Sequence, residues 1–420
     1  MSNAAQRDGG GRSPLLFIFL TVFIDLLGFG IVIPLLPIYS TAYDASETEL
    51  GLLFACFSGM QFLFAPMWGR LSDKIGRRPV LVGGLFGTAA SYALFALSDS
   101  LWMLFLSRAL AGFLAANIST AMAYVADVTT PENRAKGMGL IGAAFGIGFT
   151  LGPLMGGELT HISPAAPGWA AAGFSLLAAL YAWTQLVEPP RERRQSRVFS
   201  LEQVRGALAD DRIRTPYVLS FLFIVAFASF ESMFTAFGLA RFPEVFGLGV
   251  PIEEASVEQI LAAAPITGRY LAGIGVVSAV IQGGLIRRLV PKHGETKLAI
   301  VGPWFLAAGF LVVALAQDWT MVVIGCLLMP IGFGLNNPSV NSLISRAAPG
   351  DQQGAYLGLS QSLGSLARMV GPMSAGLVFT AYGPDAPFWM GAALLVVSGF
   401  IALRYHRIHG ASFPKKAAGH

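Results

Sequence analysis

Long apolar runs separated by short polar segments cover almost all of the 420-residue chain. About 20 apolar residues in a helix are enough to cross the hydrocarbon core of a bilayer, and the runs reach that length repeatedly. The pattern therefore predicts an all-α integral membrane protein with twelve transmembrane helices. We expect these helices over residues 14–39, 49–69, 79–98, 101–126, 137–160, 168–188, 214–240, 265–287, 297–316, 319–342, 354–380 and 386–404.

A polar stretch interrupts this pattern near the middle of the chain. Residues 189–213 are rich in arginine and contain no apolar run, which is typical of a cytoplasmic linker lying on anionic lipid headgroups. The linker separates an N-terminal six-helix half (1–188) from a C-terminal six-helix half (214–420). Residues 131–157 align with residues 350–376 at a shift of 219 residues, and residues 284–294 resemble a degenerate repeat of 69–79. Repeated halves predict a pseudo-two-fold axis with a site between them.

The distribution of charge predicts the orientation in the membrane. Charged residues make up 12% of the chain, against about 25% in soluble proteins, and the net charge is +4. Most lysines and arginines gather on one side of the predicted helices, whereas ten acidic residues lie on the other side, which includes a long loop at 241–264. By the positive-inside bias both termini are cytoplasmic. We expect a multi-pass monomer of the cell inner (plasma) membrane that contacts lipids and not nucleic acid.

The residues that carry most enzyme chemistry are not arranged for it. The two cysteines, Cys56 and Cys326, lie inside apolar runs, so neither a disulfide framework nor a metal site is expected. The chain has no phosphate-binding loop of the G-x-x-x-x-G-K-[ST] type, and its histidines fall on loops or the tail. We therefore expect no enzyme, no metal and no cofactor.

Four short motifs lie in and between the first five predicted helices. Residues 25–37 read DLLGFGIVIPLLP in the first helix, and residues 69–79 read GRLSDKIGRRP in the loop after the second. Arg108 is followed by Gly112 in the fourth helix, and residues 148–157 read GFTLGPLMGG in the fifth. Shorter segments are ADVTT at 126–130, GAAFG at 142–146 and QQGA at 352–355.

These motifs resemble those of a known transporter family. The 69–79 loop resembles the signature loop of the major facilitator superfamily, and 148–157 resembles the antiporter motif of its twelve-helix drug:proton antiporters. The shorter segments are most similar to the tetracycline-resistance efflux class. The resemblance covers nearly the whole chain and implies a major facilitator fold with two pseudo-symmetric halves. It also implies proton-coupled export of a small amphiphilic organic compound or drug by alternating access.

The chain departs from the tetracycline exporters in its membrane charges. Their seventh helix carries a glutamine and their eighth a histidine, whereas this chain has Glu231 in the seventh and no histidine near 278–282. Arg368 lies in the eleventh helix, where that class is uncharged. These departures count against tetracycline itself as the substrate.

Charged side chains inside the predicted helices are the first functional candidates. A charge at the bilayer centre costs about 2.5–3.5 kcal/mol on insertion scales, so it faces the bundle or a wet cavity. We expect Asp25, Glu231 and Arg108 to couple transport to protons, with Arg108 paired to Asp25 or to a helix carbonyl. Arg368 is expected to pair with Glu231 and, if unpaired in one state, to attract an anionic substrate group. The alternatives are structural: a hydrogen bond to a neighbouring helix for Asp25, and a fixed clamp between helices for each arginine.

Neutral polar residues and glycines supply the remaining membrane candidates. Expected substrate contacts, besides Glu231 and Arg368, are Gln61, Asn117, Asn337 and Gln361, although some amides in such positions only join helices. Small residues at four-residue spacing allow close helix approach, and proline removes a helical hydrogen bond. We expect a hinge or packing face formed by Gly148, Gly152, Pro153, Gly156 and Gly157.

The basic loop is expected to act as a conformational latch. Asp73 can bind a neighbouring helix N-terminus, where the macrodipole favours an anion. Its arginines can reach Asp127 at the end of the fourth helix or lipid headgroups, and the alternative for them is a purely topological role. The latch residues are Gly69, Arg70, Asp73, Arg77, Arg78 and Asp127.

Other functions remain open on the sequence. The same fold permits a proton-coupled symporter or facilitator that imports a metabolite, although the 148–157 motif disfavours it. A lipid or lysolipid translocase, or a transporter-like receptor without turnover, is also compatible with the pattern.

Overall fold

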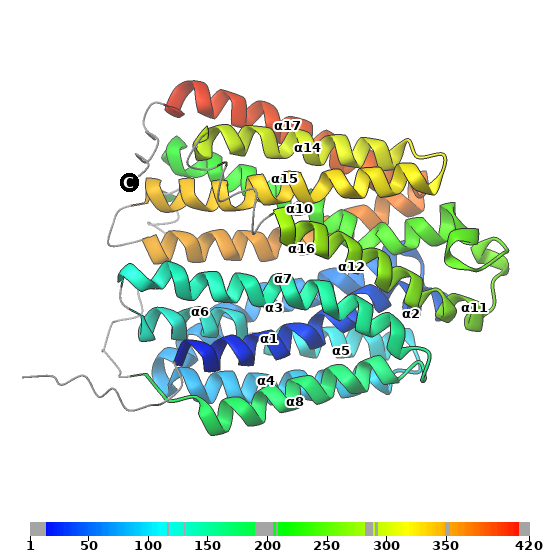
Figure 1. The fold of residues 1–420 in the computed structure, drawn as a ribbon, viewed down its shortest axis with the longest axis horizontal. Helices are drawn as coiled ribbons and strands as arrows, with labels where there is room; N and C mark the ends of the chain where they lie inside the picture. The colour runs from blue at the N-terminus through cyan, green and yellow to red at the C-terminus, as the bar shows by residue number, and fades with distance from the viewer. Residues whose placement is uncertain are drawn as a thin grey trace, which may run out of the picture.

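The computed structural model describes residues 14–115, 117–129, 131–189, 205–206, 209–281, 289, 293–348 and 353–410. These residues form helices and connecting turns and contain no strand. Figure 1 shows the long helices running side by side along one axis. The predicted all-α class is therefore confirmed.

The N-terminal set of helices forms one side of the bundle. Its 3₁₀ turn η1 contains Pro34, which lacks a backbone N–H donor, so the predicted first helix is interrupted there. The predicted fourth helix is likewise divided, into α5 and α6. The elements are α1 (Pro14–Val32), η1 (Ile33–Leu35), α2 (Leu36–Ala42), α3 (Glu47–Ile75), α4 (Arg77–Ala96), α5 (Leu101–Leu114), α6 (Asn117–Val128), α7 (Pro131–Leu159) and α8 (Ala166–Gln185).

The C-terminal set forms the other side. The predicted loop at 241–264, whose residues 252–261 are weakly helical in sequence, contains a short helix, α11, and the predicted helix end at 287 lies outside the described residues. The elements are α10 (Asp211–Arg241), η2 (Pro243–Phe246), η3 (Ile252–Glu254), α11 (Val257–Ala262), α12 (Ala264–Val280), α14 (Glu295–Ala314), α15 (Trp319–Ala347), α16 (Gln353–Tyr382) and α17 (Ala386–His409).

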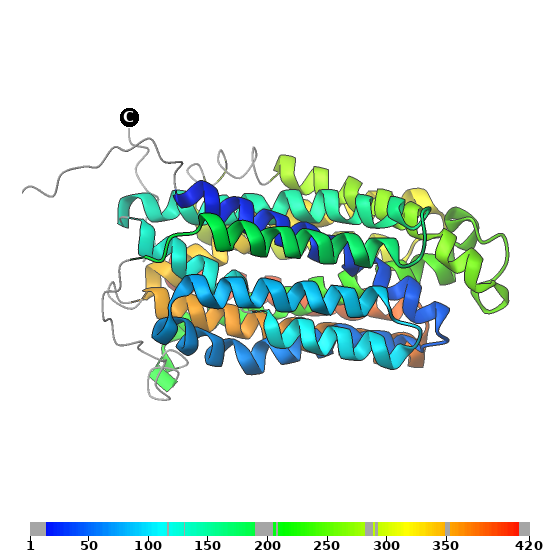
Figure 2. The ribbon, with the colours of Figure 1, turned by 90° about the horizontal axis from the view of Figure 1, so that it is seen from below.

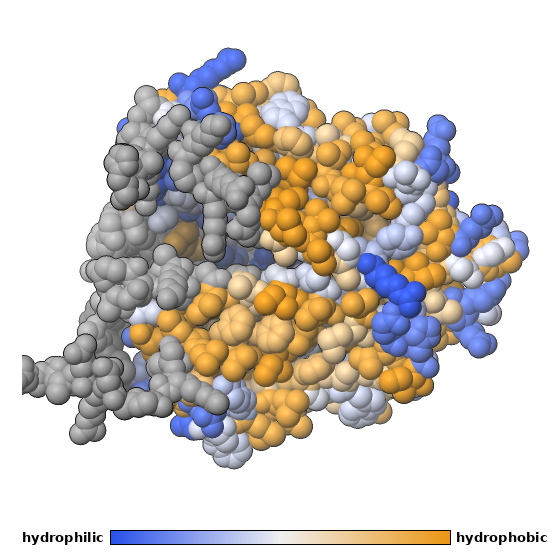
Figure 3. Space-filling model, in the orientation of Figure 1, coloured by the Kyte–Doolittle hydropathy of each residue, from blue (hydrophilic) through white to orange (hydrophobic). Residues whose placement is uncertain are grey.

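The helices are long and apolar enough for a membrane. Eight helical stretches of the described chain combine the length and hydropathy of membrane spans. Figure 3 shows hydrophobic side chains over most of the visible flank between the two ends. Large apolar side chains stand exposed on the helices, such as Leu63 and Trp102 at 66% and 73%, as expected for a lipid-facing surface. The count of twelve spans stays a prediction, as does the 189–213 linker, of which 190–204 and 207–208 lie outside the described residues.

The two ends of the bundle differ. The beginning of α1 and the end of α17 lie together at one end, called here the termini end (Figure 1). The turns around α11 project beyond the helices at the opposite end, called here the long-loop end (Figure 2). Figure 3 shows hydrophilic side chains at this long-loop end.

Local features repeat between the two sets. α4 and α14 each contain 20 residues, and each begins directly after a glycine with positive φ. These are Gly76 at 116° and Gly294 at 81°, conformations that L side chains rarely adopt. The two helices are therefore entered by the same kind of turn, as expected for repeated halves.

The two sets meet along a seam in which glycine faces backbone carbonyl groups. On α3, a Cβ added at Gly51 would lie 3.1 Å from the carbonyl carbon of Pro372. On α16, a Cβ added at Gly376 would lie 3.1 Å from the carbonyl carbon of Glu47. These contacts let α3 and α16 approach more closely than any larger residue would allow.

The same arrangement recurs between α7 and α12. A Cβ added at Gly268 would lie 3.1 Å from the carbonyl carbon of Pro153, and one at Gly157 would lie 2.7 Å from the carbonyl oxygen of Ala264. Each contact therefore has a counterpart about 218 residues away, as a pseudo-two-fold seam requires.

Polar contacts complete the seam at the long-loop end. Thr48 and Thr380 share a hydrogen bond of 2.9 Å, and Arg269 Nε lies 2.7 Å from Glu158 Oε1. Toward the middle of the bundle, Ser365 donates to Gln61 across the seam at 3.4 Å. The seam therefore runs from the long-loop end to the level of Gln61.

Candidate functional site

The Asp25 carboxylate on α1 is held by neutral donors. Asn117 Nδ2 on α6 donates to Oδ2, and Ser175 Oγ on α8 donates to Oδ1, each at 3.3 Å. Asp25 is partly buried, and Ser175 is completely buried. A carboxyl group held only by neutral partners can gain or lose a proton without breaking an ion pair.

The predicted pair of Arg108 with Asp25 is not formed. Arg108 on α5 is 2% exposed, and its guanidinium lies over the Phe57 ring, 4.9 Å from the centroid. Its Nε and Nη2 atoms have no hydrogen-bond partner among the described residues, so a helix carbonyl does not satisfy them either. The reason is that Asn117 and Ser175 donate hydrogen bonds to the Asp25 carboxylate, while the ring face of Phe57 attracts the guanidinium of Arg108.

The predicted direct pair of Glu231 with Arg368 is also absent. Arg368 on α16 donates from Nη2 to Ser365 Oγ at 3.1 Å, and no ion pair within 4 Å joins it to Glu231. Glu231 on α10 nevertheless lies close enough for the two charges to interact electrostatically. The two groups therefore interact through space without a direct ion pair.

The neutral substrate candidates fall in different surroundings. Asn117 is 5% exposed, and its Nδ2 group donates to Asp25 and to Thr88, so it positions the carboxylate. Gln61 lies on the seam, where it donates to the Ala115 carbonyl and accepts from Ser365. Asn337 is partly buried and accepts from Asn341 at 3.1 Å, and Gln361 is exposed. Of these, the structure brings Gln61 to Arg368 through Ser365, and substrate contact by any of them stays a prediction.

The predicted glycine face of α7 packs on two helices at once. Gly148, Gly152 and Gly156 meet α1, where a Cβ on Gly152 would come within 2.6 Å of the Gly30 Cα. Gly157 and the Pro153 carbonyl instead meet α12 across the seam. Pro153 lies inside the continuous helix α7. The packing role is thus visible, and the hinge role stays a prediction.

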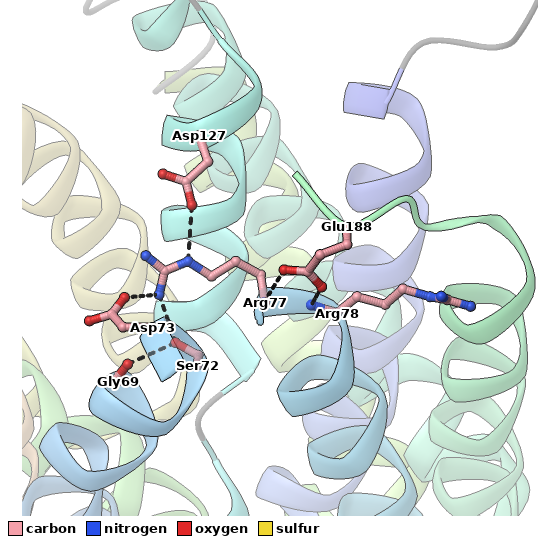
Figure 4. Close-up of polar contacts among 7 residues, drawn as sticks. All are labelled: Gly69, Ser72, Asp73, Arg77, Arg78, Asp127 and Glu188. Carbon is pink, nitrogen blue, oxygen red and sulfur yellow. Dashed lines mark hydrogen bonds and ion pairs between the residues drawn. The ribbon is translucent and has the colours of Figure 1, made fainter. Parts of the chain in front are cut away.

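Two of the predicted latch residues, Asp73 and Asp127, contact Arg77 (Figure 4). Arg77 Nη1 lies 2.6 Å from Asp73 Oδ1, and its Nε lies 3.0 Å from Asp127 Oδ2. Ser72 Oγ accepts from Nη1 at 2.7 Å. The predicted contact of Arg77 with Asp127 is therefore confirmed. Asp73 binds Arg77 at i+4 instead of the expected helix N-terminus, because the loop turns the guanidinium onto it.

The other latch candidates are placed differently. Arg70 is exposed, and a Cβ at Gly69 would meet no atom within 4 Å, so Gly69 is not required for close packing. The Arg78 side chain points away from Asp73 and donates to the Trp183 carbonyl (Figure 4). The ion-pair network therefore consists of Asp73, Arg77 and Asp127.

Sequence reasoning missed Glu188, which caps α4. Its carboxylate accepts from the backbone N–H of Arg77 at 2.7 Å and of Arg78 at 2.9 Å (Figure 4). Any Cβ at Gly76 would lie 2.7 Å from Glu188 Oε1, so the glycine is needed both for its φ and for this contact. An anion at a helix N-terminus is stabilised by unpaired N–H groups and the macrodipole. Glu188 thereby fixes the loop that carries Arg77.

A second ion pair was also missed, in the C-terminal set. Arg346 Nη1 at the end of α15 lies 2.9 Å from Glu295 Oε2 at the start of α14, and Ser342 adds a hydrogen bond of 3.2 Å. Moving Arg77 and Asp127 forward by about 218 residues gives these positions, with the signs exchanged. The repeat in the sequence was the signal for this pair.

Known proteins resemble the chain over nearly its full length. The family model of the Major Facilitator Superfamily matches residues 18–372 and 288–419. The tetracycline resistance protein, class C, of Escherichia coli is 32% identical over 396 residues, covering 92% of this chain and 93% of that protein. Multidrug resistance protein 1 of Bacillus subtilis (strain 168) is 29% identical over 386 residues, covering 91% and 94%.

A solved structure agrees with these relatives. The human organic anion transporter MFSD10 (TETRAN) has a TM-score of 0.69 and 27% identity, covering 92% of this chain and 98% of that one. Together with the apolar helices and the glycine seam, these matches identify a multi-pass membrane transporter and not an enzyme. The chain belongs to the Major Facilitator Superfamily.

Proposed function

We propose that the chain is a secondary active transporter that exports an amphiphilic organic compound in exchange for protons. The observation that carries this proposal is the Asp25 carboxylate, held between Asn117 and Ser175 within an apolar helix. Protonation there removes a charge and leaves the neutral partners in place. The proton is the only coupling ion that the proposed cycle needs, and one chain contains both sets of helices.

The seam supports alternating access. In the described state, the two sets touch from the long-loop end to the level of Gln61. We propose that the termini end faces the cytoplasm at the inner membrane, so that this state opens toward the cytoplasm. Proton and substrate then need only bind the two states with different affinities. Competition for the central charges would exchange one for the other.

The relatives favour export of organic compounds. Their names concern tetracycline resistance, multidrug resistance and organic anion transport. Glu231 and Arg368 set this chain apart from the tetracycline exporters in the residues that face its centre, so we propose a broader amphiphilic substrate class. MFSD10 is an organic anion transporter, which gives a second candidate substrate class. Arg368 favours this class because no carboxylate contacts its guanidinium among the described residues.

Flux into proteoliposomes tests the proposal. Purified protein is reconstituted, an inside-acid pH gradient is imposed, and uptake of tetracycline and of tetraphenylphosphonium is measured with and without a protonophore. Antiport predicts accumulation of at least one probe above its equilibrium level, abolished by the protonophore. Equilibration without accumulation would indicate a facilitator, and accumulation only with an inside-alkaline gradient would indicate a symporter.

A further inference from the structure

Arg368 lies near the middle of α16 and is partly exposed. α16 packs against α3 on one side and α10 on the other, so its inner face lies between the two sets of helices. A charged guanidinium at this depth is costly against lipid, so the side chain faces the interior of the bundle. Its partial exposure leaves it within reach of a ligand group.

The hydrogen bonds of Arg368 orient it without saturating it. A guanidinium has five N–H donors, and the structure gives this one a single acceptor among the described residues, Ser365 Oγ. Ser365 in turn donates to Gln61 Oε1, and Gln61 donates to the Ala115 carbonyl. This chain of contacts holds the guanidinium against the opposite set of helices, with donors left for a ligand.

Space beside the guanidinium comes from a glycine. A Cβ added at Gly364 would lie 3.5 Å from Arg368 Nη1 and 3.4 Å from Ile224 Cδ1 on α10. Phe227, partly buried, lies one helical turn before Glu231 on the same face of α10. Apolar surface from Ile224 and Phe227 therefore lies near the cation.

We propose that Arg368 anchors a subsite for the anionic group, a carboxylate or sulfonate, of an amphiphilic substrate. The planar guanidinium binds such a group through two parallel hydrogen bonds, and Ser365 and Gln61 are the positioning residues that orient it. The apolar body of the ligand lies against Ile224 and Phe227. This inference rests on the proposed function, because it assigns a substrate class to the same cavity.

Glu231 opposes the ligand in this site. Its carboxylate acts on Arg368 electrostatically without contacting it. A bound anion brings a second negative charge to the same guanidinium, so the two carboxylates repel each other. Removing the charge in Glu231→Gln should therefore tighten anion binding by about fivefold or more, the lower range of coupling between neighbouring sites.

Equilibrium binding of a matched pair of probes tests the subsite. Tritiated 2-naphthoate is bound to the full-length protein in detergent, and unlabelled 2-naphthamide, of the same shape without the charge, competes. We expect wild type to prefer the naphthoate, Arg368→Gln to lose at least tenfold in naphthoate affinity, and Arg368→Lys to retain part of it. Arg404→Gln, which removes an exposed arginine of α17, should change nothing.

Several outcomes would overturn the inference. Equal binding of the two probes by wild type, no naphthoate binding up to millimolar concentration, or a preserved preference in Arg368→Gln would each do so. The test does not depend on the arginine variants alone, since they could misfold. Glu231→Gln supplies a second test, because a folded anion site predicts tighter naphthoate binding in this variant. Unchanged binding in Glu231→Gln would therefore count against the proposal. Binding is measured without a membrane or a gradient. Failure of proton-driven flux would therefore contradict the proposed function without affecting the binding result, and the two failures can be told apart.

Discussion

Gly268 is the position at which the seam is most easily tested. Its Cα faces the Pro153 carbonyl of α7, and an added Cβ would overlap the oxygen and lie 3.3 Å from the Gly157 Cα. These neighbours are backbone atoms of a helix and cannot rotate away. Overpacking of this kind costs about 1–3 kcal/mol. In Gly268→Ala that cost applies only while the long-loop end is closed, so the closed-to-open ratio should fall by about 5–150-fold.

Spin-label distances across the long-loop end measure this ratio. Labels are placed at Ile162 and Leu315, exposed positions in the turns after α7 and α14, in a chain whose two native cysteines are replaced. Gly268→Ala in nanodiscs should move the distance distribution toward longer values. Gly273→Ala is the matched control on α12, because its Cβ would meet no atom within 4 Å. An unchanged distribution for Gly268→Ala, or an equal shift for Gly273→Ala, would refute the reasoning.

Three further substitutions address the membrane carboxylate and the termini end. Asp25→Asn should keep normal membrane levels and lose proton-driven export, and wild-type pH dependence of flux in this variant would make Asp25 structural. Asp73→Asn removes the ion pair with Arg77, which the described state forms within the N-terminal set of helices, so it should lower the thermal unfolding temperature while preserving substrate affinity; an unchanged temperature or a collapse of binding would contradict this role. Glu188→Gln should destabilise the N-terminus of α4 by about 0.5–2 kcal/mol, seen as a lower thermal unfolding temperature, and an unchanged temperature would show that the cap contributes little.

Hydropathy and local motifs predicted the helices because each depends on residues close in sequence. The Arg77–Asp127 contact was predictable for a related reason: Arg77 at the start of α4 and Asp127 at the end of α6 lie at the same end of the bundle. Which side chain Arg108 faces could not be predicted, since helical rotation and the competition from Asn117 and Ser175 are set by packing. Hydropathy predicts where a helix begins and ends, but not the rotation of the helix about its own axis, which decides the neighbours of each side chain.

Glu188 shows a different limit. Its partners are backbone N–H groups of residues 77 and 78, which leave no side-chain signature in the sequence. The Glu295–Arg346 pair was within reach, because the repeat maps it onto Arg77 and Asp127. Searching for residues of opposite sign at mapped positions, and not only for identical ones, would have found it.

The glycine-to-carbonyl seam also bears on how such a chain can diversify. Its close contacts are made by main-chain atoms at Gly51, Pro153, Gly268 and Pro372, so its geometry does not depend on side chains that face the cavity. Selection for a new substrate can then alter residues around Arg368 while the surface on which the two sets rock is inherited unchanged. In a directed-evolution experiment, gain-of-specificity mutations should accumulate in the cavity-facing positions of α3, α10 and α16, while the seam glycines stay invariant.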